Sequence, residues 1–137
     1  MLKQVSLFTA NTNGALSQVT NVLAQAGINI FTMIASDSAE FGIVRLIVDD
    51  AEKAQDKLTA AGYQCRIDRV LAVDMASDEP GTLDRILNSL HQANVFIKYC
   101  YISFDRTSAS PIAVIKTDEP ETETFLRGKG YHLLDRF

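Results

Sequence analysis

The 137-residue sequence has few of the residues from which disulfide frameworks, metal sites and catalytic pairs are built. Its two cysteines, Cys65 and Cys100, are far apart and belong to no CxxC or Cys/His spacing, which argues against a disulfide framework and a metal site. Its two histidines, His91 and His132, have no Asp or Glu partner at a spacing typical of acid–base catalysis. We therefore predict no catalytic residue, no metal, no cofactor and no enzyme activity.

The sequence also lacks a long hydrophobic run and an excess of basic residues. No segment approaches the roughly 20 apolar residues that span a bilayer. The N-terminus carries no apolar core followed by small residues, as a secretory signal peptide would. With 17 acidic residues against 13 basic ones, the net charge is -4, which repels nucleic-acid phosphates. These absences predict a cytoplasmic protein that binds neither membranes nor nucleic acids.

The chain repeats itself. Residues 13–30 align without a gap over residues 80–97 at an offset of 67, and one additional residue later shifts the offset to 68. The first alignment contains these identical pairs: Gly14/Gly81, Leu16/Leu83, Asn21/Asn88, Leu23/Leu90, Gln25/Gln92, Ala26/Ala93 and Ile30/Ile97. We predict two domains, residues 1–68 and residues 69–137. Units of this size bury only about 60% of their extended surface, so we expect the copies to support each other.

Each copy has the hydrophobic periodicity of a βαββαβ unit. The first copy predicts strands at 5–9, 28–36, 42–48 and 63–67, a polar turn at 37–40, a helix ending before Gly27, and a second helix capped by Asp49 or Asp50. The second predicts strands at 71–75, 95–104, 112–116 and 131–134, a helix at 81–93, and a helix from residue 119 with Pro120 in its first turn.

This element order predicts an α+β fold. Two βα crossovers with a central hairpin give a ferredoxin-like unit, in which both helices cover one face of an antiparallel sheet. Only residues 68–70 separate the last strand of the first copy from the first strand of the second. We therefore predict two such units packed side by side, joined by a short linker.

The loop between the first strand and the first helix of each copy is the most informative segment. It lies at a helix N-terminus, where unpaired N–H groups and the helix dipole attract a carboxylate. Gly14 and Gly81 leave room for a ligand to approach that backbone. The aligned residues Asn11 and Asp78 are also good N-cap residues, so a purely structural role explains the same spacing. Spacing alone leaves both interpretations open.

Both loops resemble the ACT domain signature, Asn/Asp-x-Pro-Gly-x-Leu, followed by Gly-Val/Ile-Asn-Ile at the second strand. The matching residues are Asn11, Thr12, Asn13, Gly14, Ala15 and Leu16 with Gly27, Ile28, Asn29 and Ile30, and Asp78, Glu79, Pro80, Gly81, Thr82 and Leu83 with Asn94, Val95, Phe96 and Ile97. The resemblance covers nearly the whole chain, twice. It implies a regulatory protein that binds an amino acid at the interface of paired domains and acts on a separate biosynthetic or catabolic enzyme.

The resemblance also implies roles for single residues. Asn11 and Asn29 match two asparagines that hold the ligand in serine-binding members, and an amide can both accept from an ammonium group and donate to a carboxylate. Asn29 fits equally well as a residue that satisfies turn backbone. Asn13 replaces the usual proline, and Phe96 stands where the first copy has Asn29. The second site is therefore either degenerate or shaped for a larger side chain, and the first copy is favoured.

Other functions of the same fold are less well supported by the sequence. An RNA-binding module would stack bases on Tyr99, Tyr101 and Phe104, but the segment at 42–45 does not supply its Arg/Lys-Gly-aromatic motif. An acylphosphatase would need an arginine in the first βα loop, and neither loop has one. A protein-interaction module without a small ligand remains an alternative, and exposed outer strand edges favour homodimerisation.

Overall fold

The structure is a computed structural model that describes residues 1–36 and 41–137, so the predicted turn at 37–40 lies outside the described residues. The elements are β1 (Leu2–Ala10), α1 (Ala15–Gln25), β2 (Ile30–Ser36), β3 (Phe41–Val48), α2 (Ala51–Ala60), β4 (Cys65–Asp74), α3 (Thr82–Gln92), β5 (Tyr99–Phe104), β6 (Pro111–Lys116) and α4 (Thr122–Gly128). They form two compact units: an N-terminal unit, Lys3–Asp68, and a C-terminal unit, Arg69–Phe137 with Met1–Leu2. None of the described helices combines the length and apolarity that a membrane crossing requires.

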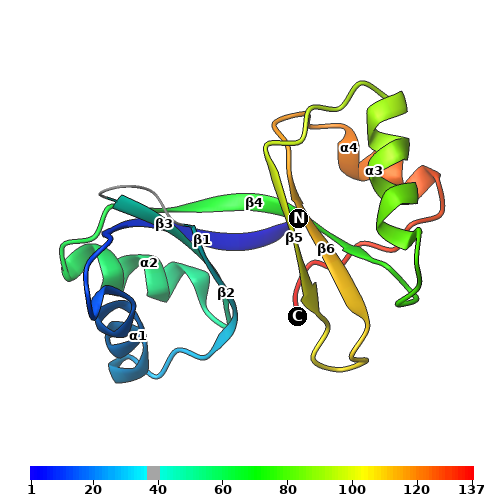
Figure 1. Ribbon diagram of the computed structural model, residues 1–137. Coiled ribbons are helices and arrows are strands. Elements are labelled where there is room, and N and C mark those ends of the chain that lie inside the picture. Colours follow the sequence, from blue (N-terminus) through cyan, green and yellow to red (C-terminus); the bar gives the residue numbers. More distant parts are fainter. Residues whose placement is uncertain (37–40) are drawn as a thin grey trace. The chain divides into compact units, whose positions relative to one another are not determined.

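The N-terminal unit is a four-stranded sheet with two helices on one face (Figure 1). Its strand order is β2-β3-β1-β4, and β3 pairs antiparallel with both β1 and β2. The alternation of Val5 and Leu7 in β1 brings their side chains to the helices, where α1 contributes Val19 and Leu23 at helical spacing. These residues form one buried cluster with Ile28, Val44, Leu46, Val48, Ala51, Ala54 and Leu58.

The C-terminal unit repeats this architecture. Its strands run in the order β4-β6-β5, with Leu71 opposite Ile115 and Tyr101 opposite Val114, and α3 and α4 lie on the same side of the strands (Figure 1). The core contains Leu71, Val73, Met75, Ile86, Leu90, Ala113, Ile115, Leu126 and Leu133. The α+β, ferredoxin-like fold class is thus confirmed within each unit.

The predicted linker at 68–70 is wrong. Residues 65–74 form one uninterrupted strand, β4, which passes through the boundary between Asp68 and Arg69. Val70 is fully buried, as a residue in a strand can be and a residue in an exposed linker is not. Two strands that the sequence suggested separately are therefore one element, whose first half belongs to the N-terminal unit and whose second half belongs to the C-terminal unit.

Four other boundaries differ from the prediction. The last predicted strand, at 131–134, is reduced to a single bridge between Val73 and Leu133. Helix α4 begins at Thr122 rather than at residue 119, so Pro120 lies in the turn before the helix instead of in its first turn. Strands β2 and β5 begin at Ile30 and Tyr99, later than residues 28 and 95. Frayed element ends of this kind are the part of a sequence-based assignment that periodicity defines least well.

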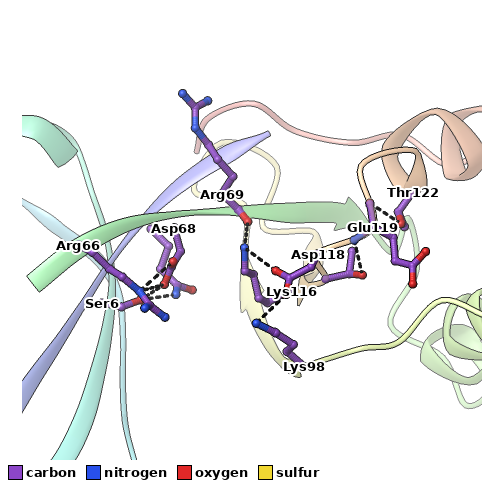
Figure 2. A network of polar contacts seen from close by, with 11 residues as sticks. Ser6, Arg66, Asp68, Arg69, Lys98, Lys116, Asp118, Glu119 and Thr122 are labelled. Atoms are coloured by element: carbon purple, nitrogen blue, oxygen red, sulfur yellow. Dashed lines mark hydrogen bonds and ion pairs between the residues drawn. The ribbon is translucent and has the colours of Figure 1, made fainter.

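A polar chain lies on the face of the N-terminal sheet that points away from its helices. The fully buried Gln4 donates through its amide to Ser6 Oγ at 2.9 Å, and Ser6 Oγ donates to Asp68 Oδ2 at 2.7 Å. Arg66 Nε lies 3.1 Å from the other oxygen, Asp68 Oδ1 (Figure 2). The carboxylate is thereby supplied with donors, which is the condition for keeping a mostly buried charge in place.

A second set of polar contacts holds the C-terminal unit together. Lys116 Nζ donates to the backbone oxygen of Arg69 at 3.2 Å and lies 3.7 Å from Asp118 Oδ1 (Figure 2). Asp118 Oδ2 lies 2.7 Å from Lys98 Nζ. The hydrogen bond from Lys98 lowers the pKa of the Asp118 carboxyl below its ordinary value. These contacts tie β6 to β4 and to the segment before β5.

Candidate functional site

The β1–α1 loop of the N-terminal unit borders an open cavity of about 530 Å³. The cavity is lined by residues 9–17 together with Ala35, Ser36, Gly42 and Val44. All six predicted loop residues of the first copy, Asn11 to Leu16, belong to this lining. The hollow therefore lies between the start of α1 and the loop-proximal ends of β2 and β3, within a single unit.

The start of α1 presents unpaired backbone donors to this cavity. Gly14 is the N-cap, adopts a left-handed conformation with φ 82°, and offers no side chain to cap the helix. The first bond of the helix runs from Gln18 N to Gly14 O at 3.0 Å. The N–H groups of Leu16 and Ser17 precede that bond and have no acceptor within the helix. An anionic group in the cavity would find two donors and the positive end of the helix dipole.

The expectation that Asn11 and Asp78 are N-caps is wrong. The N-caps are Gly14 and Gly81, and neither α1 nor α3 receives a hydrogen bond from a capping side chain. In both copies the residue before the helix is left-handed, a conformation that costs glycine little. By contrast Asp50 does cap α2, as predicted, because its carboxylate accepts from Lys53 N at 3.1 Å.

The described walls of the N-terminal cavity leave its loop backbone open to a ligand. None of the described lining residues carries a formal charge. A Cβ placed on Gly14 would meet nothing within 4 Å, so the loop backbone is open to approach. A Cβ placed on Gly42 would lie 2.7 Å from the backbone oxygen of Ser36, closer than real Cβ contacts allow. Gly42 is therefore required by the close approach of β2 and β3 at the cavity wall.

The same loop in the C-terminal unit is covered by the protein's own side chains. Gly81 is again the left-handed N-cap, with φ 93°. The Arg85 side chain folds back toward it, placing Nη1 3.4 Å from the position of a Gly81 Cβ and donating from Nη2 to Thr82 Oγ1 at 3.3 Å. Ser77 Oγ lies 3.3 Å from the same Thr82 hydroxyl. These three side chains form a hydrogen-bonded cover over the start of α3.

Residues aligned with the N-terminal cavity wall are larger in the C-terminal unit. The offsets of 67 and 68 pair the following residues: Ala10 with Ser77, Ala15 with Thr82, Ser36 with Phe104, Gly42 with Ser110, and Val44 with Ile112. Ser110 Oγ also donates to Asp74 Oδ1 at 2.7 Å, which fastens the β5–β6 hairpin to β4. The uncharged Asn11, Thr12 and Ser17 are replaced by Asp78, Glu79 and Asp84.

The structure does not bring the remaining predicted site residues to the cavity. Asn29 lies before β2, near Val48, at the opposite end of β3 from Gly42. Its backbone exchanges two hydrogen bonds of 3.1 Å with Asp49: Asn29 N donates to the carboxylate and Asn29 O accepts from Asp49 N. Ile30 packs against the core, and Phe96 is 72% exposed. Within one unit, the two asparagines of the motif lie at opposite ends of the sheet.

Residues that the sequence reasoning missed are the wall residues Ala35, Ser36, Gly42 and Val44. The available signal was the strand register: an antiparallel β1–β3 pair places Thr9 opposite Gly42, and Val44 opposite Leu7. A second hollow of about 640 Å³ lies beside the first, between β1, α1 and the segment before β4, and Phe8, Gln18 and Tyr63 contribute to it. Its signal in the sequence was Phe8, a large apolar residue out of phase with the alternating Val5 and Leu7.

The thiols show no features of a nucleophile. Cys100 packs against the C-terminal core, and its burial raises the pKa of the thiol. Cys65 lies 3.3 Å from Thr59 Oγ1. A partly buried thiol with a raised pKa, such as that of Cys100, is a weak nucleophile. Among residues 1–36 and 41–137, no three His, Cys, Asp or Glu side chains are grouped as a metal site requires.

Comparison with known proteins identifies the family. The model of the ACT domain pair matches residues 1–129. This chain belongs to the ACT domain family. The ACT pair superimposes on a crystal structure of a Bacteroides thetaiotaomicron protein with a TM-score of 0.84 and 32% identity, covering 97% of this chain and 91% of that one. No curated protein sequence matches significantly.

The fold of this ACT pair is shared with regulatory subunits. The regulatory subunit of aspartate kinase from Thermus thermophilus has a TM-score of 0.67 and 20% identity, covering 93% of this chain and 90% of that chain. The corresponding subunit from Thermus flavus has a TM-score of 0.61 at 20% identity, with coverage of 91% and 88%. At these identities the likeness concerns the fold.

Proposed function

We propose that this ACT pair is a regulatory protein that binds an amino acid in the cavity of the β1–α1 loop and acts, without catalysing a reaction, on a separate cytoplasmic enzyme of amino-acid metabolism. The observation that carries the proposal is the open cavity at the start of α1. Its described lining residues are uncharged, and the N-cap of the helix is a glycine without a capping side chain. An α-carboxylate would accept from the N–H groups of Leu16 and Ser17. An α-ammonium group would donate to side-chain oxygens of Asn11 or Asn13.

Membership of the ACT family and the fold shared with aspartate kinase regulatory subunits support a regulatory role. The RNA-binding alternative has no comparable support. The net charge of -4 is unfavourable for binding a phosphate backbone. We retain Asn29 and Ile30 as proposed contacts only for a ligand held between paired domains, since they lie outside the cavity.

A thermal-shift screen tests the proposal. Each of the 20 common amino acids is added at 10 mM, a concentration chosen so that a dissociation constant of about 100 μM corresponds to roughly 2.7 kcal/mol of stabilisation. We expect one or a few related amino acids to raise Tm by several degrees. A screen in which none raises Tm would contradict amino-acid sensing at this site.

Two matched variants localise the response. Asn13→Ala removes an amide from the cavity lining, whereas Asn21→Ala removes an exposed amide from α1 outside it. We expect Asn13→Ala to reduce the ligand-induced Tm shift at least by half and Asn21→Ala to leave it unchanged. Equal ligand-induced Tm shifts in the two variants would show that the ligand binds outside this cavity.

A further inference from the structure

The two copies of the βα loop differ in what they offer to a ligand. In the N-terminal unit the start of α1 faces an open cavity, and a side-chain atom added at Gly14 would meet nothing within 4 Å. In the C-terminal unit the equivalent position at Gly81 already has a guanidinium nitrogen of Arg85 at 3.4 Å. The backbone conformation is the same, since both glycines are left-handed N-caps. The difference therefore comes from side chains.

The cover over Gly81 is built from three side chains that the N-terminal copy lacks, because Ala10 stands in place of Ser77 and two further positions also differ. Thr82 is 5% exposed, and its hydroxyl is the common partner of Ser77 Oγ and Arg85 Nη2, both at 3.3 Å. The aligned residues in the first copy are Ala15, which has no hydroxyl, and Gln18, which is shorter than arginine and uncharged. Without the Thr82 hydroxyl there is no acceptor at this place to hold a long side chain over the helix start.

The charged residues around the two loops also favour carboxylate binding in the N-terminal unit over the C-terminal unit. The C-terminal loop and first helical turn carry Asp78, Glu79 and Asp84, all exposed. These three carboxylates repel a fourth, and the Arg85 guanidinium that could offset them is engaged with Thr82 Oγ1.

We propose that the C-terminal copy is closed to amino acids by the Ser77–Thr82–Arg85 cover and its acidic rim, so that each chain binds one amino acid, in the N-terminal unit. This inference rests on the proposed function and specifies which of the two sites performs it. The two sites of the duplication have thereby become one binding site and one closed copy that keeps the same backbone.

Stoichiometry and a reciprocal exchange test the inference. Isothermal titration uses the amino acid that gives the largest Tm shift in the screen of 20. We expect one ligand per chain in the wild type. The closing variant Ala15→Thr/Gln18→Arg installs the cover in the N-terminal loop and should weaken binding at least tenfold. The opening variant Thr82→Ala/Arg85→Gln removes it from the C-terminal loop and should retain wild-type affinity at the N-terminal site.

Several outcomes would overturn the inference. They are two ligands per wild-type chain, wild-type affinity in the closing variant, and loss of binding in the opening variant, which would make Arg85 a ligand contact instead of a cover. If the closing variant fails to fold, as judged by circular dichroism, the wild-type stoichiometry and the opening variant still decide, because two ligands per wild-type chain would refute a closed C-terminal copy. A wild type that binds no amino acid refutes the proposed function itself, and is thus distinguishable from a failure of the single-site inference.

Discussion

The N-terminal and C-terminal units have the same backbone conformation at the βα loop, but the side chains around that loop differ. Gly14 and Gly81 occupy the same left-handed position, yet one faces an open cavity and the other lies under Arg85. A duplicated site can thus lose accessibility through a few side chains while its fold is unchanged. The glycine of the motif therefore determines the conformation of the loop, whereas the neighbouring side chains determine whether a ligand can reach it.

The largest expected effect is a loss of stability on substitution of Gly42, at the cavity wall of the N-terminal unit. Gly42→Ala forces a methyl group against the Ser36 backbone oxygen, 2.7 Å from the new Cβ, so β2 and β3 must separate. We expect a loss of about 2 kcal/mol in the free energy of unfolding, as for other overpacked sites. Urea unfolding monitored by circular dichroism measures this loss.

The aligned control is Ser110→Ala in the C-terminal unit. This change removes the hydrogen bond from Ser110 Oγ to Asp74 without adding atoms, and we expect it to cost about 1 kcal/mol. Equal effects of the two variants would show that the β2–β3 contact can relax, and that Gly42 is not required by packing.

Substitution of the N-cap glycines is expected to cost less stability, and about the same amount in both units. Gly14→Ala and Gly81→Ala both force an alanine into the left-handed region, at a cost of about 1 kcal/mol each. Only Gly14→Ala should also reduce the amino-acid-induced rise in Tm, because its methyl group projects into the open side of the loop. A reduced ligand response in Gly81→Ala would show that the C-terminal loop participates in binding.

The smallest effect concerns pH and the hairpin loop of the C-terminal unit. Hydrogen bonds from Thr107 N and Ser108 Oγ lower the pKa of the Asp105 carboxyl below its ordinary value. A carboxyl with a lowered folded-state pKa adds stability above its ordinary pKa and loses it as the pH falls through the folded-state value. Carbon-13 NMR should therefore show Asp105 titrating at lower pH than an aspartate in a short unstructured peptide. Titration at the peptide value would mean that the two hydrogen bonds do not persist in solution.

Much of the fold follows from periodicity and repetition in the sequence. The spacing of Val19 and Leu23 and the alternation of Val5 and Leu7 predict the buried faces that the structure shows. The continuity of β4 could not be predicted, because residues 68–70 include two charged side chains and look like a turn when read alone. Their strand conformation depends on pairing with segments distant in the sequence, and local propensity does not report such pairing.

The candidate site was predicted in part. The loop at 11–16 follows from a short motif, because glycine and a helix start are local features. The wall formed by Ala35 and Gly42 depends on strand register and is invisible in a single segment. The cover by Arg85 depends on one rotamer held by Thr82, which no spacing rule encodes. The sequence therefore indicated where a ligand could bind better than it indicated what surrounds it.

The uninterrupted course of β4 has a consequence for how this gene can be divided. Cutting between residues 68 and 69 would split a strand, and it would also leave Met1 and Leu2, which pack with the C-terminal unit, attached to the wrong half. Leu2 is only 4% exposed, so the separated C-terminal half would lack part of its packing. Recombination that shuffles single modules between genes would deliver two incomplete products. The two units are consequently expected to be inherited together, as one gene segment.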